Sequence, residues 1–148
     1  MVEITGGEPL LQEQVYSLFE KLENEGFKIL LETNGSISLQ NVPDKIVKIV
    51  DVKTPGSKCN DSFVLENLKL IDPDKDEIKF VLCSKTDYEW SKKFIIQNNL
   101  ESYKLLFSAV TDNLEVKELA GWIVKDKLPV RLQLQLHKYI WDKNEKGV

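Results

Sequence analysis

Short apolar segments alternate with amphipathic segments along the whole chain, and this alternation limits the fold more than any other feature. Strands are expected at residues 2–5, 28–33, 46–53, 77–83, 103–110 and 130–136. Helices are expected at residues 10–25, 86–98 and 113–127, with a short one at 62–70. Strands joined through helices pair in parallel with right-handed crossovers. The sequence therefore predicts an α/β fold with a mostly parallel sheet, in a single domain over residues 1–148.

Composition excludes several classes of protein. The net charge is −4, and basic residues are interspersed with acidic ones, which argues against a nucleic-acid surface. No apolar run has the length of a membrane span, and the first residues lack the basic region of a signal peptide, so we expect a cytoplasmic protein. Two cysteines, Cys59 and Cys83, are fewer than a cubane cluster needs and are interpreted as reduced thiols. No catalytic or metal-binding residue is assigned.

The residues after each expected strand are the candidates for a site, because parallel sheets bind ligands at the carboxyl ends of their strands. Gly6 and Gly7 follow the first strand and let a backbone approach a ligand closely. Their amides, with the helix that follows, favour a carboxylate or a phosphate. Glu8 beside them can accept hydrogen bonds from an ammonium group. Together these residues suit an amino-acid-like ligand.

Each candidate also has a structural interpretation. The glycine pair before a helix can be a tight turn, and Asn34-Gly35 is typical turn chemistry. Lys53 can be a solvated surface lysine, although it ends an apolar strand. Gln133 and Gln135 alternate with leucines, as they also would in a half-exposed strand. The single histidine, His137, excludes a histidine-rich metal site.

Four segments together resemble one family. The segment 5–9, TGGEP, is similar to the GGEP motif of radical-SAM enzymes, and ETNG at 32–35 follows at the next strand end as it does there. The segment 51–57, DVKTPGS, resembles the strand-four segment of 7-carboxy-7-deazaguanine synthases. Residues 130–138, with Trp141 and the final Gly-Val, resemble the C-terminal signature of that family. The resemblance covers essentially the whole chain and implies a partial (β/α)6 radical-SAM barrel.

The resemblance also implies an activity. Such enzymes are lyases of queuosine and 7-deazapurine biosynthesis that convert 6-carboxy-5,6,7,8-tetrahydropterin into 7-carboxy-7-deazaguanine with loss of ammonia. The implied cofactors are S-adenosylmethionine (SAM), a [4Fe–4S] cluster and Mg²⁺, and the implied partner is the small pterin substrate. Cofactors of this kind carry the difficult chemistry, while the protein binds and orients them.

The same resemblance implies residue roles. The residues implied to bind SAM are Gly6, Gly7, Glu8, Asp51, Val52, Lys53, Ser108, Ala109, Val110 and Thr111. The residues implied to bind the pterin are Thr5, Gln135, His137 and Val148.

The sequence departs from the family in one respect. The CxxxCxxC motif of the family precedes GGEP, and this chain has no such motif. We therefore expect a chain that lacks the first β/α unit with its cluster loop, and that is inactive by itself. A sheet without its first strand has an exposed edge, which predicts a homodimer or a higher assembly.

Two other functions remain open from the sequence. A fragment of an activating enzyme for glycyl radicals shares the GGEP and Asn-Gly signals. A domain without a cluster that binds a nucleotide or a partner protein is the second possibility.

Overall fold

A single parallel sheet organises the chain in the computed structural model, which describes residues 1–136, 140 and 141. The strands follow the sheet order β1 to β6, each one pairing in parallel with the next along the chain. Their bounds are Val2–Ile4, Ile29–Thr33, Val47–Asp51, Glu77–Leu82, Lys104–Ala109 and Arg131–Leu132. The expectation of an α/β fold with a parallel sheet is confirmed.

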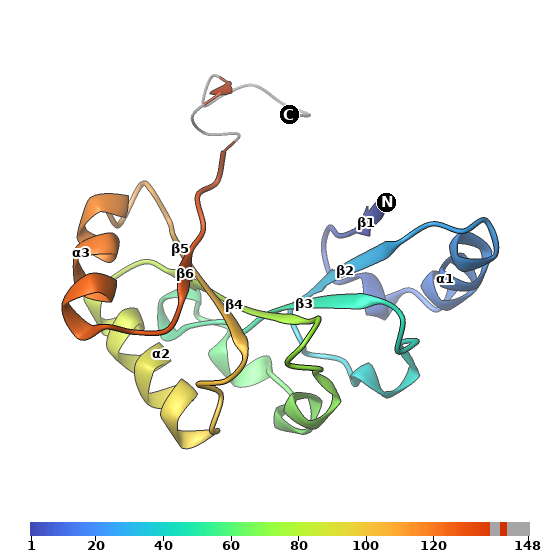
Figure 1. Ribbon diagram of the computed structural model, residues 1–148, viewed down its shortest axis with the longest axis horizontal. Coiled ribbons are helices and arrows are strands. Elements are labelled where there is room, and N and C mark those ends of the chain that lie inside the picture. The colour runs from blue at the N-terminus through green and yellow to red at the C-terminus, as the bar shows by residue number, and fades with distance from the viewer. Residues whose placement is uncertain (137–139, 142–148) are drawn as a thin grey trace.

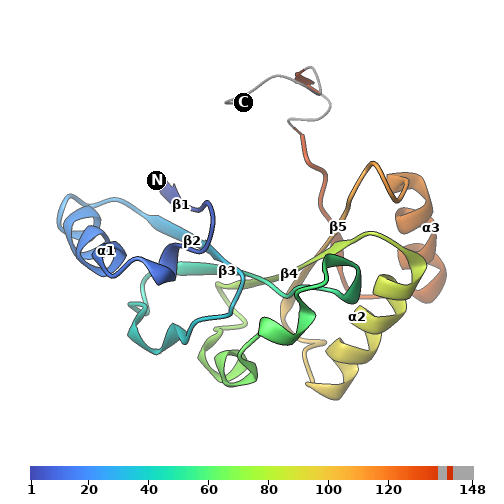
Figure 2. The same cartoon turned by 180° about the vertical axis from the view of Figure 1, so that it is seen from behind.

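The α-helices of the described residues all pack on one side of this sheet (Figures 1 and 2). Their bounds are α1 Gln14–Asn24, α2 Lys85–Gln97 and α3 Val116–Asp126. Short 3-10 segments accompany them at Pro9–Leu11, Leu39–Asn41, Pro55–Ser57, Asn60–Ser62 and Leu65–Leu70. Within the part of the chain that the structure describes, no helix is both long and apolar enough to cross a membrane.

The sequential strand order explains why the helices share one side. Right-handed crossovers between neighbouring parallel strands all lie on the same face when the order never reverses. In β4, Ile78, Phe80 and Leu82 are fully buried beneath the helices, whereas Lys79 and Val81 between them are only half-buried. The sheet therefore has a dry face under the helices and a second face, which α1, α2 and α3 do not cover and which we call the open face.

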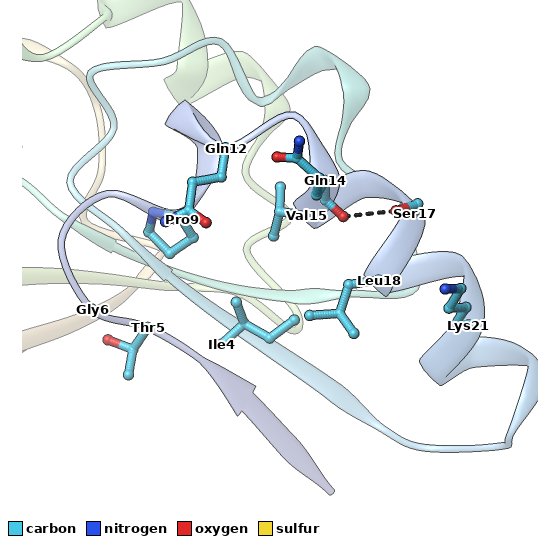
Figure 3. A pocket seen from close by; sticks show the side chains of 10 residues that line it. All are labelled: Ile4, Thr5, Gly6, Pro9, Gln12, Gln14, Val15, Ser17, Leu18 and Lys21. Carbon is cyan, nitrogen blue, oxygen red and sulfur yellow. Dashed lines mark hydrogen bonds between the residues drawn. The ribbon is translucent and has the colours of Figure 1, made fainter.

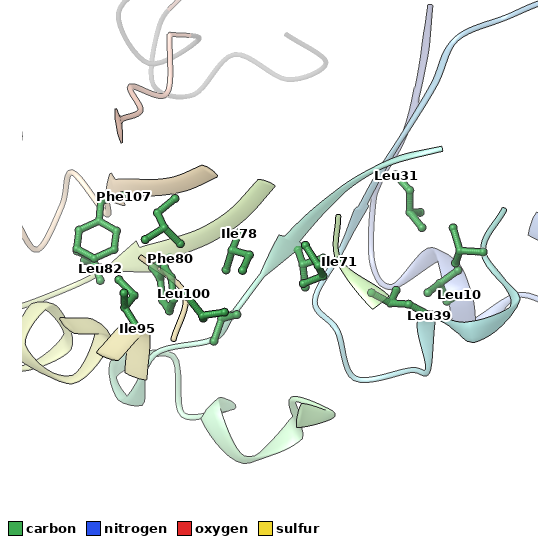
Figure 4. Close-up of a cluster of buried hydrophobic side chains, with 14 of the residues drawn as sticks. Leu10, Leu31, Leu39, Ile71, Ile78, Phe80, Leu82, Ile95, Leu100 and Phe107 are labelled. Carbon is green, nitrogen blue, oxygen red and sulfur yellow. The ribbon is translucent and has the colours of Figure 1, made fainter. Parts of the chain in front are cut away.

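The dry face holds the hydrophobic core. Figure 4 shows Phe80 and Phe107 of two neighbouring strands beside Leu82 of β4 and Ile95 of α2. The rings of Phe80 and Phe107 meet edge to face, with centroids 5.5 Å apart. This continuous packing fixes the strands and hence the position of every strand end.

Three elements differ from the sequence prediction. The helix expected at 10–25 is split, because Pro9 opens a 3-10 turn capped by Glu8 and α1 starts only at Gln14. The helix expected at 62–70 is a 3-10 segment from Leu65, and Asn67 within it turns a fully buried side chain to backbone groups of other loops. The last strand is two residues long instead of seven.

A buried carboxylate fastens the amino-terminal ends of β3 and β4. Asp76 is fully buried and accepts hydrogen bonds from the backbone amides of Lys48 (2.9 Å) and Asp72 (3.0 Å). It also pairs with the ammonium groups of Lys48 (2.9 Å) and Lys75 (2.8 Å). Burial alone would raise the pKa of Asp76, but these donors outweigh it and hold the pKa below its ordinary value.

We expect Asp76→Asn to lower the free energy of unfolding by about 3 kcal/mol, because it leaves the buried Lys48 ammonium without its counter-charge. A carboxyl with a depressed pKa stabilises the fold above its unfolded pKa, and this contribution is lost as the pH falls through the folded pKa. The wild type should therefore lose this part of its stability below about pH 4, near the ordinary pKa of 3.8. Urea unfolding of both proteins between pH 7 and pH 3 measures the difference.

The matched control is Asp74→Asn, which changes an exposed carboxylate in the same loop. It should leave the free energy of unfolding within about 0.5 kcal/mol of wild type. A constant gap between Asp76→Asn and wild type down to pH 3 would contradict the role given to Asp76.

Candidate functional site

The carboxyl ends of the parallel strands meet at one edge of the sheet, and there the open face is polar. The register pairs Asp51 of β3 with Lys79 of β4, so both side chains lie on the open face in one row. Val81 of β4 pairs with Ser108 of β5 in the next row. The segments that sequence analysis singled out are therefore neighbours in space.

A glycine loop leaves β1 at this edge. Gly6 and Gly7 have φ angles of +94° and +56°, a region that other residues adopt only at a cost. Both residues are exposed, and no atom lies within 4 Å of the position that a Cβ would take. The loop thus presents an uncovered backbone, as the approach of a ligand requires.

Glu8 is tied into the protein by both of its oxygens. Its carboxylate is 8% exposed and accepts hydrogen bonds from the Leu10 amide (3.1 Å), the Thr33 hydroxyl (2.8 Å) and the Asn34 amide (2.7 Å). These bonds fix the glycine loop against the end of β2. The arrangement makes Glu8 a brace between two strand ends, and an ammonium donor has to share its oxygens with these bonds.

Asp51 carries a buried acceptor without a partner. Its Oδ2 atom binds the ammonium of Lys53 at 2.6 Å, whereas its Oδ1 atom is buried and has no hydrogen-bond partner among the described residues. A buried, unpaired carboxylate oxygen is costly unless a ligand supplies a donor. Val52, between the two, is fully buried on the side of the helices.

Glu32 and Lys79 belong to the same face, and the sequence analysis did not assign them to the site. Lys79 donates to Glu32 at 2.5 Å, and the Thr5 hydroxyl donates to the other oxygen of Glu32 at 3.1 Å. Burial would raise the pKa of Glu32, but the ammonium of Lys79 and the Thr5 hydroxyl lower it below its ordinary value. The available signal was a lysine in the middle of an apolar strand, two residues before Val81.

The residues at the end of β5 lie on both faces of the sheet. Ser108 is 1% exposed and lies on the open face, whereas Ala109 pairs with Leu82 and faces the helices. Val110 and Thr111 continue half-buried beyond the strand, and the Val110 amide still donates to Leu82. Of these four residues, Ser108 presents its side chain to the same face as Asp51.

The segment after β6 runs beside this edge. The Gln133 amide donates to the Phe107 carbonyl at 2.8 Å, and the side-chain oxygen of Gln133 is buried without a hydrogen-bond partner in the part of the chain that the structure describes. Gln133 and Gln135 are half-buried, whereas Leu134 and Leu136 are 41% and 61% exposed, so the glutamines face the protein. The expected site residues His137 and Val148 lie outside the described residues.

The described residues suit SAM as a ligand better than they suit a metal ion or cluster. Cys59 and Cys83 are free thiols, and two thiolates do not satisfy a cubane cluster. Among residues 1–136, 140 and 141, no group of three or more His, Cys, Asp or Glu side chains could hold a metal ion. The exposed glycine backbone and the unpaired oxygens of Asp51 and Gln133 do fit a ligand with several hydrogen-bond donors, as SAM has.

A second loop of the site, after β2, is packed against the 3-10 segments. The Asn67 amide group donates to the carbonyls of Gly35 (3.0 Å) and Ile37 (2.9 Å), and its oxygen accepts from Leu39 (2.9 Å). Gly35 has a φ of +68°, and a Cβ there would lie 2.5 Å from the Phe63 ring. This glycine is therefore required both for its backbone conformation and for space.

Solved structures place the fold in a known class. The chain resembles the crystal structure of QueE from Escherichia coli with a TM-score of 0.66 and 18% identity, over 89% of this chain and 56% of that one. It resembles SuiB from Streptococcus suis bound to S-adenosylmethionine with a TM-score of 0.55 and 14% identity, over 97% of this chain and 41% of that one. No family model matches the sequence. The α/β fold with its parallel sheet is thus shared with these two proteins, and the expected fold class is confirmed.

Curated relatives identify the family. The 7-carboxy-7-deazaguanine synthase of Koribacter versatilis is 44% identical over 163 residues, which cover 100% of this chain and 72% of that protein. The synthase of Chlorobaculum tepidum is 40% identical over 150 residues, covering 99% and 68%. The chain belongs to the 7-carboxy-7-deazaguanine synthase family, and the resemblance seen in the sequence is confirmed.

Two glycine substitutions separate the backbone and packing requirements of the loop after β2. Gly26 also has a positive φ, +76°, but a Cβ there meets no atom within 4 Å. Gly26→Ala should lower the free energy of unfolding by about 1 kcal/mol, for the left-handed backbone alone. Gly35→Ala should cost about 1–3 kcal/mol more, because the methyl group also displaces Phe63. Chemical denaturation of both variants measures the difference, and equal losses would contradict the packing role.

Proposed function

We propose that the chain forms the SAM-binding and pterin-binding part of a radical-SAM 7-carboxy-7-deazaguanine synthase. The observation that carries the proposal is the alignment, on one edge of the sheet, of an open glycine backbone with buried acceptors that lack partners. Membership of the family supplies the reaction, in which 6-carboxy-5,6,7,8-tetrahydropterin becomes 7-carboxy-7-deazaguanine with loss of ammonia. The proposed pathway is queuosine biosynthesis.

The residues divide into two proposed groups. SAM lies along the edge from the Gly6-Gly7 backbone to Asp51 and Lys53, and on to the segment 108–111. Asp51 offers its unpaired oxygen to the ammonium or ribose groups of SAM, and Lys53 keeps the other oxygen fixed. Glu8 contributes chiefly by holding the glycine loop in place.

The pterin is proposed to lie over the open face, next to SAM. Thr5, Glu32 and Lys79 form one hydrogen-bonded unit there, which offers both a carboxylate and an ammonium to a polar heterocycle. Gln133 and Gln135 are proposed to close the pocket from the side of β6, together with His137 and Val148.

The family's chemistry also involves a reduced [4Fe–4S] cluster, which with SAM would supply the hydrogen-abstracting radical, and Mg²⁺, which would assist the rearrangement. The described residues do not fit the cluster, and we expect this chain by itself to bind SAM without turnover. The proposed compartment is the cytoplasm, since Cys59 and Cys83 are free thiols.

The proposed SAM contact can be tested by titrating the chain with SAM in a calorimeter. Asp51→Asn should weaken binding about tenfold, or 1.4 kcal/mol, because a charge-assisted hydrogen bond is lost. Glu77→Gln is the matched control, since it removes a paired carboxylate from the same face at the opposite, amino-terminal edge. Glu77→Gln should bind SAM like wild type. Equal binding by Asp51→Asn and wild type would contradict the assignment of Asp51.

The reaction itself needs a longer protein, extended over the part of its relatives that this chain does not match. If the genomic DNA upstream of the Met1 codon is open in the same reading frame, its translation gives the extension to test. With SAM, a reconstituted cluster, reductant and Mg²⁺, the extended protein should convert the pterin, whereas the 148-residue chain should not. Liquid chromatography of the reaction mixture measures whether 7-carboxy-7-deazaguanine is formed. SAM cleavage without consumption of the pterin would contradict the proposed substrate.

We further propose that two copies pair through β1. The Val2 amide donates to Lys28 in the loop before β2, so Val2 and Ile4 direct their backbone groups to β2 and Glu3 directs its own outward. Beside this edge, Ile4 and Leu18 face each other across a groove of about 460 Å³ (Figure 3). Leu11 and Leu18 remain 68% and 43% exposed. An edge strand whose outer side pairs with no other described strand, beside exposed leucines, suits a second copy of the same edge.

Light scattering at micromolar concentration should give about twice the mass of one chain. Glu3→Pro removes the outward amide without touching the bonds to β2, and it should produce a monomer. Glu3→Gln keeps that amide and serves as the control, which should remain dimeric. A monomeric wild type would contradict the proposal.

A further inference from the structure

The segment 52–56 follows β3, and every second residue in it donates a hydrogen bond to β4 or α2. The Val52 amide donates to a β4 carbonyl at 2.8 Å, and the Thr54 hydroxyl donates to the next but one carbonyl of β4 at 3.0 Å. The Gly56 amide donates to Oδ1 of Asp87 at 2.8 Å. Figure 2 shows this segment (green) beside α2, from which Asp87 comes. The attached residues are thus 52, 54 and 56.

Asp51, directly before the first attachment, and Lys53, between the first two, point the other way. Asp51 and Lys53 lie on the open face and are joined by their own ion pair at 2.6 Å. Thr54 is fully buried, and Lys53 remains one-third exposed. The attachments on one side of the segment therefore determine where Asp51 and Lys53 point on the other.

Asp87 is the last of these attachments and lies out of reach of a ligand, being 1% exposed. Its Oδ2 atom accepts the Cys83 amide at 2.9 Å, and its own amide donates to the helix cap Ser84 at 3.2 Å. In an ordinary capping box, the acid at this position bonds back to the cap residue. Here the carboxylate joins the end of β4, the start of α2 and the turn at Gly56.

Gly56 is a glycine because of this carboxylate. Its φ lies outside the left-handed region, so its backbone conformation is open to other residues. A Cβ at Gly56, however, would lie 2.4 Å from Oδ2 of Asp87. A side chain at position 56 would therefore have to displace this carboxylate from the amides that hold it.

We propose that Asp87 is a positioning residue, which holds the turn after β3 in the shape that directs Asp51 and Lys53 at SAM. The inference rests on the proposed function for the identity of the ligand. Two observations support it. Asp87 accepts hydrogen bonds from backbone amides of two different segments, and a Cβ at Gly56 would clash with its carboxylate.

The test compares Asp87→Asn with Asp76→Asn. Both residues are buried carboxylates that accept two backbone amides, but Asp76 lies at the amino-terminal edge of the sheet, far from the proposed site. SAM binding is measured by calorimetry, stability by urea unfolding, and amide exchange at Gly56 and Cys83 by nuclear magnetic resonance. Asp87→Asn should weaken SAM binding by about tenfold or more, because displacements of about 1 Å at a site have effects up to the order of a hundredfold.

Asp76→Asn should lower stability and leave the SAM affinity of the folded protein unchanged. Exchange at Gly56 should accelerate in Asp87→Asn alone. If both variants change SAM binding equally, or neither does, Asp87 has only a structural role and the inference is overturned. If the wild type binds no SAM, the proposed function fails, and the inference is then decided by exchange: unaltered protection at Gly56 in Asp87→Asn overturns it.

Gly56→Ala perturbs the same contact from the other side and does not depend on the helix cap. It should weaken SAM binding as Asp87→Asn does. The double variant should lose less SAM affinity than the product of the two single losses, since both substitutions remove the same interaction. If the two single losses of SAM affinity multiply in the double variant, Asp87 and Gly56 act independently of each other. That outcome would overturn the inference.

Discussion

The position of every functional group in this protein depends on strands that pair in parallel in the order of the chain. Because the order never reverses, α1, α2 and α3 fall on one face, and the carboxyl ends of the strands fall on one edge. The dry face binds the strands together through rings such as Phe80 and Phe107, whereas the open face combines the buried Leu106 with polar side chains. That face can accommodate charges such as Asp51 and Lys79, which a core would exclude.

Three buried carboxylates connect this sheet to its loops in the same way. Asp76, Asp87 and Glu8 are each at most 8% exposed, and each accepts backbone amides from two different segments. A charged acceptor can satisfy several donors of an irregular loop at once, which a carbonyl in a sheet cannot. Asp76 stabilises the amino-terminal edge of the sheet, and Asp87 and Glu8 hold the loops at the carboxyl edge. The loops of the candidate site are therefore irregular in conformation but fixed in place.

The sequence predicted the sheet well because apolar periodicity reports which residues face the helices. All six strands were found, and so was the cluster of segments at their carboxyl ends. The 3-10 segment at Leu65 was missed, because its shape depends on Asn67 bonding to a loop about thirty residues away, which no local pattern encodes. Lys79 was missed for a similar reason: its neighbour Glu32 is defined only by pairing across β3. Ser108 and Ala109 could not be separated until the register placed them on opposite faces.

The contact between Gly56 and Asp87 has a consequence for how this family can change during evolution. Position 56 is closed to side chains only while position 87 carries a carboxylate pointing at it. A lineage that first replaced the aspartate by a smaller residue would gain the freedom to place a side chain at position 56, whereas the opposite order of events would pass through a clash. The two positions, 31 residues apart, should therefore vary together among homologues, with the change at 87 preceding the change at 56.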